Sequence, residues 1–169
     1  MPTEQFTDAI ALLKADHRTV EDLFAKFEKA SGSKKQAIAE EICNDLKIHA
    51  MIEEEVFYPA LRGKIDDDLL DEAYVEHDGA KVLINDILAG GEGDDFYDAK
   101  VTVLSEEIEH HVKEEEEPGK GMFAQARQAE VDLVALRDKL AALKQKLMAQ
   151  LESEGLPPAQ PTAVKNLNA

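Results

Sequence analysis

The sequence predicts an all-α protein, built as an up-down-up-down four-helix bundle with an additional long C-terminal helix. Apolar residues recur every three or four positions in four successive segments, as on one face of a helix. Breaks rich in glycine, serine or proline separate these segments. Aromatic residues make up only 5% of the 169 residues and tryptophan is absent, which argues against a β-rich domain.

The four periodic segments have the lengths and short connections of bundle helices. Their apolar stripes cover residues 10–27, 38–56, 70–87 and 97–115. The first ends at Ser31-Gly32-Ser33, the third before residues 90–93 and the fourth before residues 118–121, which are all poor helix formers. Short connections place consecutive helices side by side and antiparallel, which is the arrangement of a four-helix bundle.

The remainder of the chain divides into a helix and a tail. Residues 1–121 form the predicted bundle, and leucines at near-heptad spacing between Leu133 and Leu151 predict one long helix over 122–153. We expect this helix to lie on the bundle or to pair with another chain, so self-association through it is possible. Residues 154–169 contain prolines and polar residues and are predicted to be a disordered tail.

Charge and composition exclude several classes of function. The 36 acidic and 19 basic residues give a formal net charge of -17, which argues against nucleic acid and anionic membranes as partners. The single cysteine, Cys43, excludes an internal disulfide. We find no apolar run that could span a membrane and no secretory signal, so a cytoplasmic location is expected.

Polar residues interrupt each apolar stripe at positions where the core of a bundle requires apolar side chains. Each of the four stripes carries one histidine, and in two of them a glutamate follows four residues later on the same face. The residues concerned are His17, His49, Glu53, His77, His111 and Glu115. Burying them without strong partners costs several kcal/mol each, and divalent cations supply such partners. Imidazole with carboxylate suits iron, manganese or zinc, and this number of ligands suits two metals better than one.

An internal repeat supports the same interpretation. The pair Asp16-His17 recurs as Glu76-His77, and the pattern from His49 to Glu53 recurs after His111. The chain therefore consists of two related helical hairpins, each with one histidine followed by a His-x-x-x-Glu motif. A pseudo-twofold arrangement places one metal near each hairpin.

These motifs resemble the hemerythrin-like proteins of the HHE cation-binding group. The matching stretches are residues 12–17, 49–59, 74–77 and 109–117, and the resemblance covers about residues 8–127. It implies a four-helix bundle around a non-haem di-iron centre, with two iron ions held by the six residues above. The resemblance also implies that Glu53 and Glu115 bridge the irons, together with an oxo or hydroxo group.

One position departs from the oxygen-carrying members of that family, which have a His-x-x-x-His motif on the third helix. Here Ala73 stands four residues before His77, so the fifth histidine is missing. Tyr74 and Glu76 are candidates to replace it. An iron with an open or oxygen-ligated position should favour redox chemistry with peroxide or nitric oxide over reversible oxygen binding.

Several neighbouring residues leave alternatives. His110 also has a glutamate four residues later, Glu114, but the repeat and the apolar stripe favour His111. Asp45 and Glu107 stand four residues before a candidate ligand and could orient its ring. Three further expectations concern packing and solvation: Tyr58 serves packing, the acidic pairs 54–55 and 116–117 are solvated, and the cavity at the site is lined by Phe24, Ile52, Val56, Ile84 and Ile108.

The function expected from this sequence is that of a non-haem di-iron protein binding dioxygen or its reduced forms, for storage, sensing or removal of peroxide. The alternative is a metal- or oxygen-responsive regulatory module, whose fifth helix is exposed to a partner. A bundle without metal is the third possibility.

Overall fold

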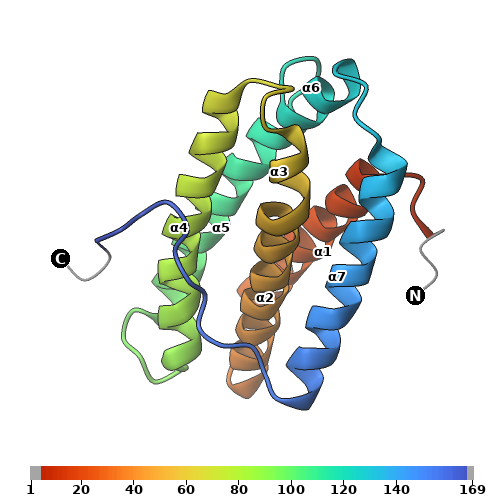
Figure 1. Ribbon diagram of the computed structural model, residues 1–169. Coiled ribbons are helices and arrows are strands. Elements are labelled where there is room, and N and C mark those ends of the chain that lie inside the picture. Colours follow the sequence, from red (N-terminus) through yellow and green to blue (C-terminus); the bar gives the residue numbers. More distant parts are fainter. Residues whose placement is uncertain (1–4, 167–169) are drawn as a thin grey trace.

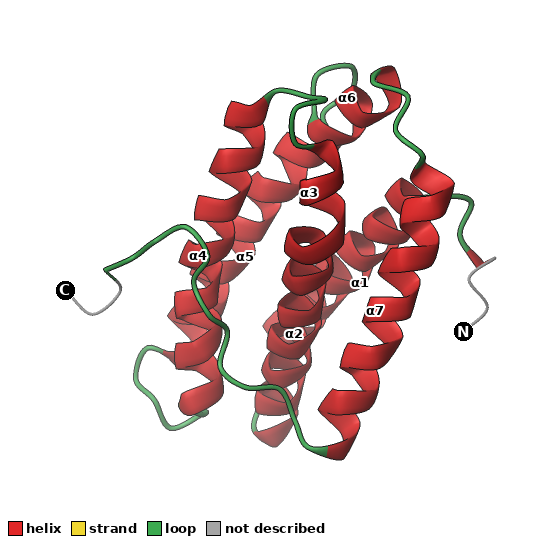
Figure 2. Ribbon diagram, viewed as in Figure 1, coloured by secondary structure: helices red, strands yellow, loops and turns green. Residues whose placement is uncertain are grey.

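The computed structural model describes residues 5–166 and shows an antiparallel helical bundle (Figure 1). Every regular element in this range is a helix, as Figure 2 shows. The elements are α1 (Ala9–Lys29), α2 (Ser33–Ile52), η2 (Glu53–Phe57), α3 (Tyr58–Leu61), α4 (Asp67–Ala89), α5 (Tyr97–Glu116), α6 (Met122–Gln128) and α7 (Leu133–Ser153). The predicted all-α bundle with an additional C-terminal helix is confirmed, and no described helix is long and apolar enough to cross a bilayer.

The four main helices form two hairpins, α1 with α2 and α4 with α5. Aspartate side chains cap the N-termini of several helices, where the backbone N–H groups of the first turn have no partner within the helix. The Asp8 side chain accepts from the amide of Ala11 at 2.9 Å, and Asp132 accepts from Ala135 at 3.0 Å at the start of α7. Such caps define where a helix begins.

Two apolar clusters fill the bundle, one towards each end. On α1, residues up to Leu13 belong to the first cluster and residues from Val20 onwards belong to the second. On α4 the change falls between Ala73 and Ala80. The polar residues singled out by the sequence therefore occupy a layer between two dry cores.

The C-terminal region differs from the expected single helix over 122–153. A turn at 129–132 separates α6 from α7, and Glu130 in this turn has a positive φ of 56°. Helix α7 packs against α1 and α2 of its own bundle, and buries Leu133, Leu136, Leu140 and Leu147. These leucines are therefore buried against helices of the same chain.

The segment after α7 also differs from the expected disordered tail. Residues 155–164, which we call the C-terminal strap, run across α2 and α4 (Figure 1) and hydrogen-bond to both helices. Residues 167–169 of the expected tail lie outside the described part of the chain.

Candidate metal centre

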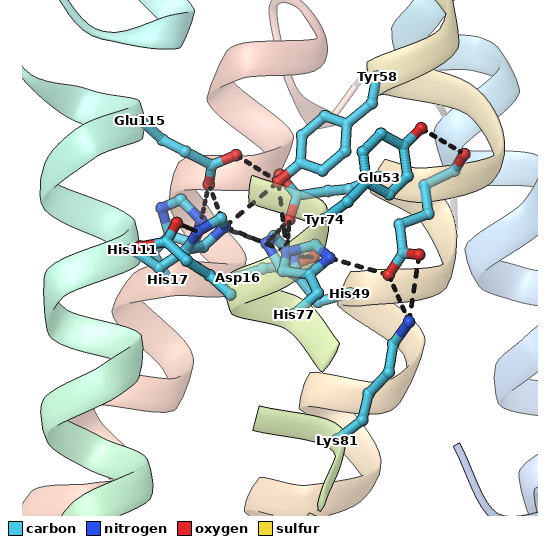
Figure 3. A network of polar contacts seen from close by, with 12 residues as sticks. Asp16, His17, His49, Glu53, Tyr58, Tyr74, His77, Lys81, His111 and Glu115 are labelled. Atoms are coloured by element: carbon cyan, nitrogen blue, oxygen red, sulfur yellow. Dashed lines mark hydrogen bonds and ion pairs between the residues drawn. The ribbon is translucent and has the colours of Figure 1, made fainter. Parts of the chain in front are cut away.

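All six residues predicted as metal ligands meet in the polar layer between the two cores (Figure 3). One comes from α1, one from α2, one from η2, one from α4 and two from α5. Each of the six is buried, and Glu53 has no exposed surface. These side chains point inward because they occupy positions of the apolar stripe, and the helical period of 3.6 residues keeps that stripe on the buried face.

The six side chains form two groups that share Glu53. In the first group, His17, His49, Glu53 and Glu115 bring one ligand atom each within 4.8 Å of all the others. In the second group, His77 and His111 do so with Glu53. The arrangement is that of two neighbouring cation sites with a common carboxylate.

The imidazole nitrogens face one another in pairs. The Nε2 atoms of His17 and His49 are 3.2 Å apart, and those of His77 and His111 are 3.1 Å apart. Two neutral imidazoles in such a pair can share only one proton, so at least one lone pair is left to a cation.

The buried carboxylate oxygens at the centre have imidazole nitrogens as close neighbours. Both oxygens of Glu53 and the Oε1 of Glu115 are without an assigned hydrogen bond from residues 5–166, while Nε2 of His49 lies 3.0 Å from Glu53 and Nε2 of His17 lies 3.3 Å from Glu115. A buried carboxylate without donors is costly. The donor set therefore fits divalent cations, which bind imidazole nitrogen and carboxylate oxygen together.

Carboxylates behind the histidines fix the orientation of their rings. The Nδ1–H of His49 donates to Asp16 at 3.0 Å, and that of His111 donates to Glu76 at 2.8 Å. This leaves each Nε2 free to face the centre, as in carboxylate–histidine–metal sites.

The other two histidines are oriented across the hairpins. The Nδ1–H of His77 donates to Glu54 at 2.9 Å, whereas Nδ1 of His17 lies 3.5 Å from Glu116 in a looser ion pair. The four contacts run from α1 to α2, from η2 to α4, from α4 to α5 and from α5 back to α1. We call this closed series the carboxylate ring, and each of its members has a further cationic or imidazole partner: Lys144 for Asp16, Lys81 for Glu54, His110 for Glu76 and Arg18 for Glu116.

The carboxylate ring was not expected from the sequence. Glu54 and Glu116 were assigned to a solvated face, and Asp45 and Glu107 were considered for the orienting role instead. The internal repeat could have predicted these four carboxylates, because Asp16 matches Glu76 and Glu54 matches Glu116 in the two hairpins.

The charges within the layer shift its pKa values. Burial lowers the pKa of His49, but Glu53 and Asp16 outweigh this effect and raise it well above the ordinary value. Burial likewise lowers the pKa of His77, but Glu53 and Glu54 raise it to about 9. The surrounding carboxylates therefore favour the protonated form of these two imidazoles, and a cation that binds their nitrogens has to displace those protons.

Tyr58 enters the layer from the turn that follows Glu53. Its hydroxyl donates to Oε2 of Glu115 at 2.9 Å and lies 3.2 Å from Nε2 of His111. The five-residue π-helix before it makes this possible, since Pro59 cannot donate a hydrogen bond and its ring would crowd the preceding turn of a regular helix. Burial and Glu115 raise the pKa of Tyr58 well above its usual value, so the phenol holds its proton.

Neither candidate for the missing fifth histidine reaches the centre. Ala73 is buried in the adjacent core. The hydroxyl of Tyr74 points to the backbone oxygen of Glu54 at 3.5 Å, and Glu76 is bound to His111. Tyr58, which the sequence assigned to packing, occupies this side of the layer instead.

Two further residues complete the surroundings. Phe123 on α6 stacks on His17, with ring centroids 5.9 Å apart and planes 11° apart, and nothing in the sequence indicated this contact. His110 lies outside the layer, where it contacts Glu76 and Glu114 at 3.1 Å. The predicted register of His111 and Glu115 therefore agrees with the placement of the side chains.

A cavity of about 300 Å³ adjoins the four histidines. Ile84 and Ile108 line it as expected, whereas Phe24, Ile52 and Val56 are not among its lining residues. Residues 157–162 of the C-terminal strap form part of its wall.

Comparisons with known proteins agree with this arrangement. The family model described as Hemerythrin HHE cation binding domain matches residues 8–118. A solved structure of a Hemerythrin HHE cation binding domain-containing protein, the Rv2633c homolog from Mycobacterium kansasii, superposes with a TM-score of 0.72 at 23% identity and covers 89% of this chain and 96% of that one. A DNA nickase from Nostoc sp. (strain PCC 7120) is 30% identical over 106 residues, which span 62% of this chain but only 30% of that relative.

Proposed function

The chain belongs to the Hemerythrin HHE cation binding domain family, and we propose that its buried cluster holds two iron ions that bind dioxygen or react with peroxide or nitric oxide. The observation that carries this proposal is the convergence of four Nε2 atoms on the buried carboxylate oxygens of Glu53 and Glu115. Storage, sensing and peroxide removal all use such a centre.

The division of ligands follows from the two groups. His17, His49 and Glu115 would hold one iron and His77 and His111 the other, with Glu53 common to both groups. Iron supplies a redox-active Lewis acid when bound there.

The protein side chains orient the histidine rings, hold a proton on the Tyr58 hydroxyl and surround the layer with apolar residues. The carboxylate ring keeps each Nε2 directed at the centre. Tyr58 holds a proton on its hydroxyl beside Glu115, where it can be donated to a small oxygen ligand by a hydrogen bond. The apolar clusters cover the layer towards both ends of the bundle.

Two other functions have less support. The regulatory alternative relied on an exposed leucine stripe, but α7 buries that stripe on its own bundle. A role on DNA, as printed for the Nostoc relative, would require a cationic surface, whereas this chain has a net charge of -17 and spans less than a third of that relative.

Metal analysis of protein purified without added metal tests the proposal. We expect about two iron ions per chain by mass spectrometry, with near-ultraviolet absorption bands in the same sample. Dioxygen, peroxide and nitric oxide are then added separately, and the spectral change identifies which of them reacts. Protein without iron that also takes up none during anaerobic reconstitution would contradict the proposal.

A further inference from the structure

The cavity beside the histidines is much larger than a diatomic ligand requires. Its volume of about 300 Å³ corresponds to roughly ten atoms of the size of a water oxygen. The walls between the helices are apolar, and they are formed by Val20, Leu46, Ala80, Ile84, Ile108 and Val112. A space of this size and polarity suits the apolar part of a small organic molecule.

The C-terminal strap closes the outer side of this cavity through specific contacts. Asn85 on α4 exchanges two hydrogen bonds with the backbone of Ala159, at 2.9 and 2.8 Å. Buried Asp78 accepts from the backbone amides of Thr162, Ala163 and Val164 at 2.6 to 2.9 Å. These hydrogen bonds attach the C-terminal strap to α4, so this wall of the cavity has a defined position.

One buried cation in the cavity wall has spare hydrogen-bonding capacity. Lys47 is 5% exposed, and its ammonium donates to the backbone oxygen of Leu156 at 3.3 Å. Within residues 5–166 no carboxylate lies within ion-pair distance of it. The second lysine of the wall, Lys81, differs because it pairs with Glu54 at 2.9 Å and Asp78 at 3.1 Å.

We propose that the cavity binds an aliphatic carboxylate of about ten heavy atoms, with its head group on Lys47 and its chain directed towards the four histidines. A carboxylate would satisfy the spare N–H groups of the ammonium, and the alkyl chain would fill the apolar walls. That this molecule is the substrate of the centre rests on the proposed function, whereas its binding does not.

Calorimetry with octanoate on the full-length, iron-loaded protein tests the proposal. Octanoate has ten heavy atoms, acetate keeps the head group without the chain, and 1-octanol keeps the chain without the charge. We expect one octanoate to bind per chain, and acetate and 1-octanol to bind at least about tenfold more weakly. Absence of octanoate binding overturns the proposal, and equal affinity for 1-octanol overturns the role of Lys47.

Variants separate the head group from the chain. Lys47→Met keeps the apolar stem, so octanoate affinity should fall about tenfold while 1-octanol binding is unchanged. Ala80→Leu fills the cavity and should weaken both ligands. Lys35→Met is the control, because Lys35 pairs with Asp98 away from the cavity, and it should leave both affinities unchanged.

The iron content of each sample distinguishes this proposal from the proposed function. Octanoate binding by protein that takes up no iron would support the cavity as a ligand site and contradict the di-iron centre. Full iron content without octanoate binding would contradict the ligand site alone.

Discussion

His110 and His111 are neighbours in the sequence but lie in opposite surroundings. The His110 side chain is 64% exposed and contacts Glu76 and Glu114, whereas that of His111 is 6% exposed and faces His77. Both have a glutamate four residues later, so spacing alone does not separate them. The apolar stripe does, because it fixes which side of the helix is buried.

Replacement of each histidine by alanine should separate the two roles. His111→Ala removes an Nε2 from the second group, so we expect at least half of the bound metal to be lost. His110→Ala should retain the full metal content, because its ring belongs to neither of the two groups at the centre. Mass spectrometry of metal per chain measures both, and equal loss in the two variants would contradict the assignment.

Asp45 lies near the carboxylate ring but is not one of its members, and its pKa is raised. It stands four residues before His49, but Asp16 accepts the ring N–H of that histidine instead. Burial, together with the charges of Glu41 and Asp16, raises the pKa of Asp45 from 3.8 to about 6. Ionised Asp45 therefore opposes folding, and this penalty grows as the pH rises from 4 to 6.

Asp45→Asn should therefore stabilise the protein at neutral pH. The folded pKa lies above the unfolded one, so the wild type loses stability as this carboxyl ionises, and the amide does not. We expect a gain of about 1–3 kcal/mol at pH 7.5 that has mostly vanished at pH 4. Urea unfolding at the two pH values measures it, and unchanged metal content shows that Asp45 is not needed to orient His49.

At the scale of elements, the sequence predicted the four long helices because a 3.6-residue period is visible in any apolar stripe. It did not predict η2, since a π-turn changes the register by one residue without leaving a compositional trace. Tyr58 was assigned to packing because it stands at the end of the predicted second helix. The second hairpin offers no help, because Lys120-Gly121 stands where the first hairpin has Tyr58-Pro59.

The connection between α5 and α6 requires a glycine. A Cβ on Gly121 would lie 2.7 Å from the carbonyl oxygen of Glu115 and 2.7 Å from the amide nitrogen of Glu117. Both are backbone atoms, which cannot rotate away. The turn thus packs directly on the end of α5 that carries Glu115.

Gly121→Ala should destabilise the protein by about 1–3 kcal/mol, because the backbone at the end of α5 must shift. Gly93→Ala is the matched control: a Cβ there meets no atom within 4 Å, so the change should stay within about 0.5 kcal/mol. Thermal unfolding of both variants makes the comparison. Equal stability of the two would mean that the turn relaxes without cost.

At the scale of the whole molecule, the C-terminal strap was beyond prediction from local composition. Its prolines and polar residues are those of a disordered segment. It is nevertheless ordered because its backbone finds partners on α4 more than 70 residues away, chiefly the buried Asp78 and the half-buried Asn85. Such long-range partners leave no local pattern in the sequence.

Asp78→Ala should release the strap while leaving the bundle folded. The variant removes the acceptor of three amides, at Thr162, Ala163 and Val164. We expect hydrogen exchange at these amides to accelerate about tenfold or more. Asp86→Ala on the same helix, where the side chain pairs with Lys100, should leave that exchange unchanged. Unaltered exchange in Asp78→Ala would show that apolar contacts alone hold the strap.

The carboxylate ring relates the two hairpins by an approximate twofold symmetry. Each hairpin provides one orienting contact within itself and one to the other hairpin, and the two halves do so with matching residues. Two identical hairpins meeting across a twofold axis would close the same ring without any additional residue. The chain thus has the internal symmetry of a dimer of hairpins within one polypeptide, and Tyr58 marks where the two halves differ.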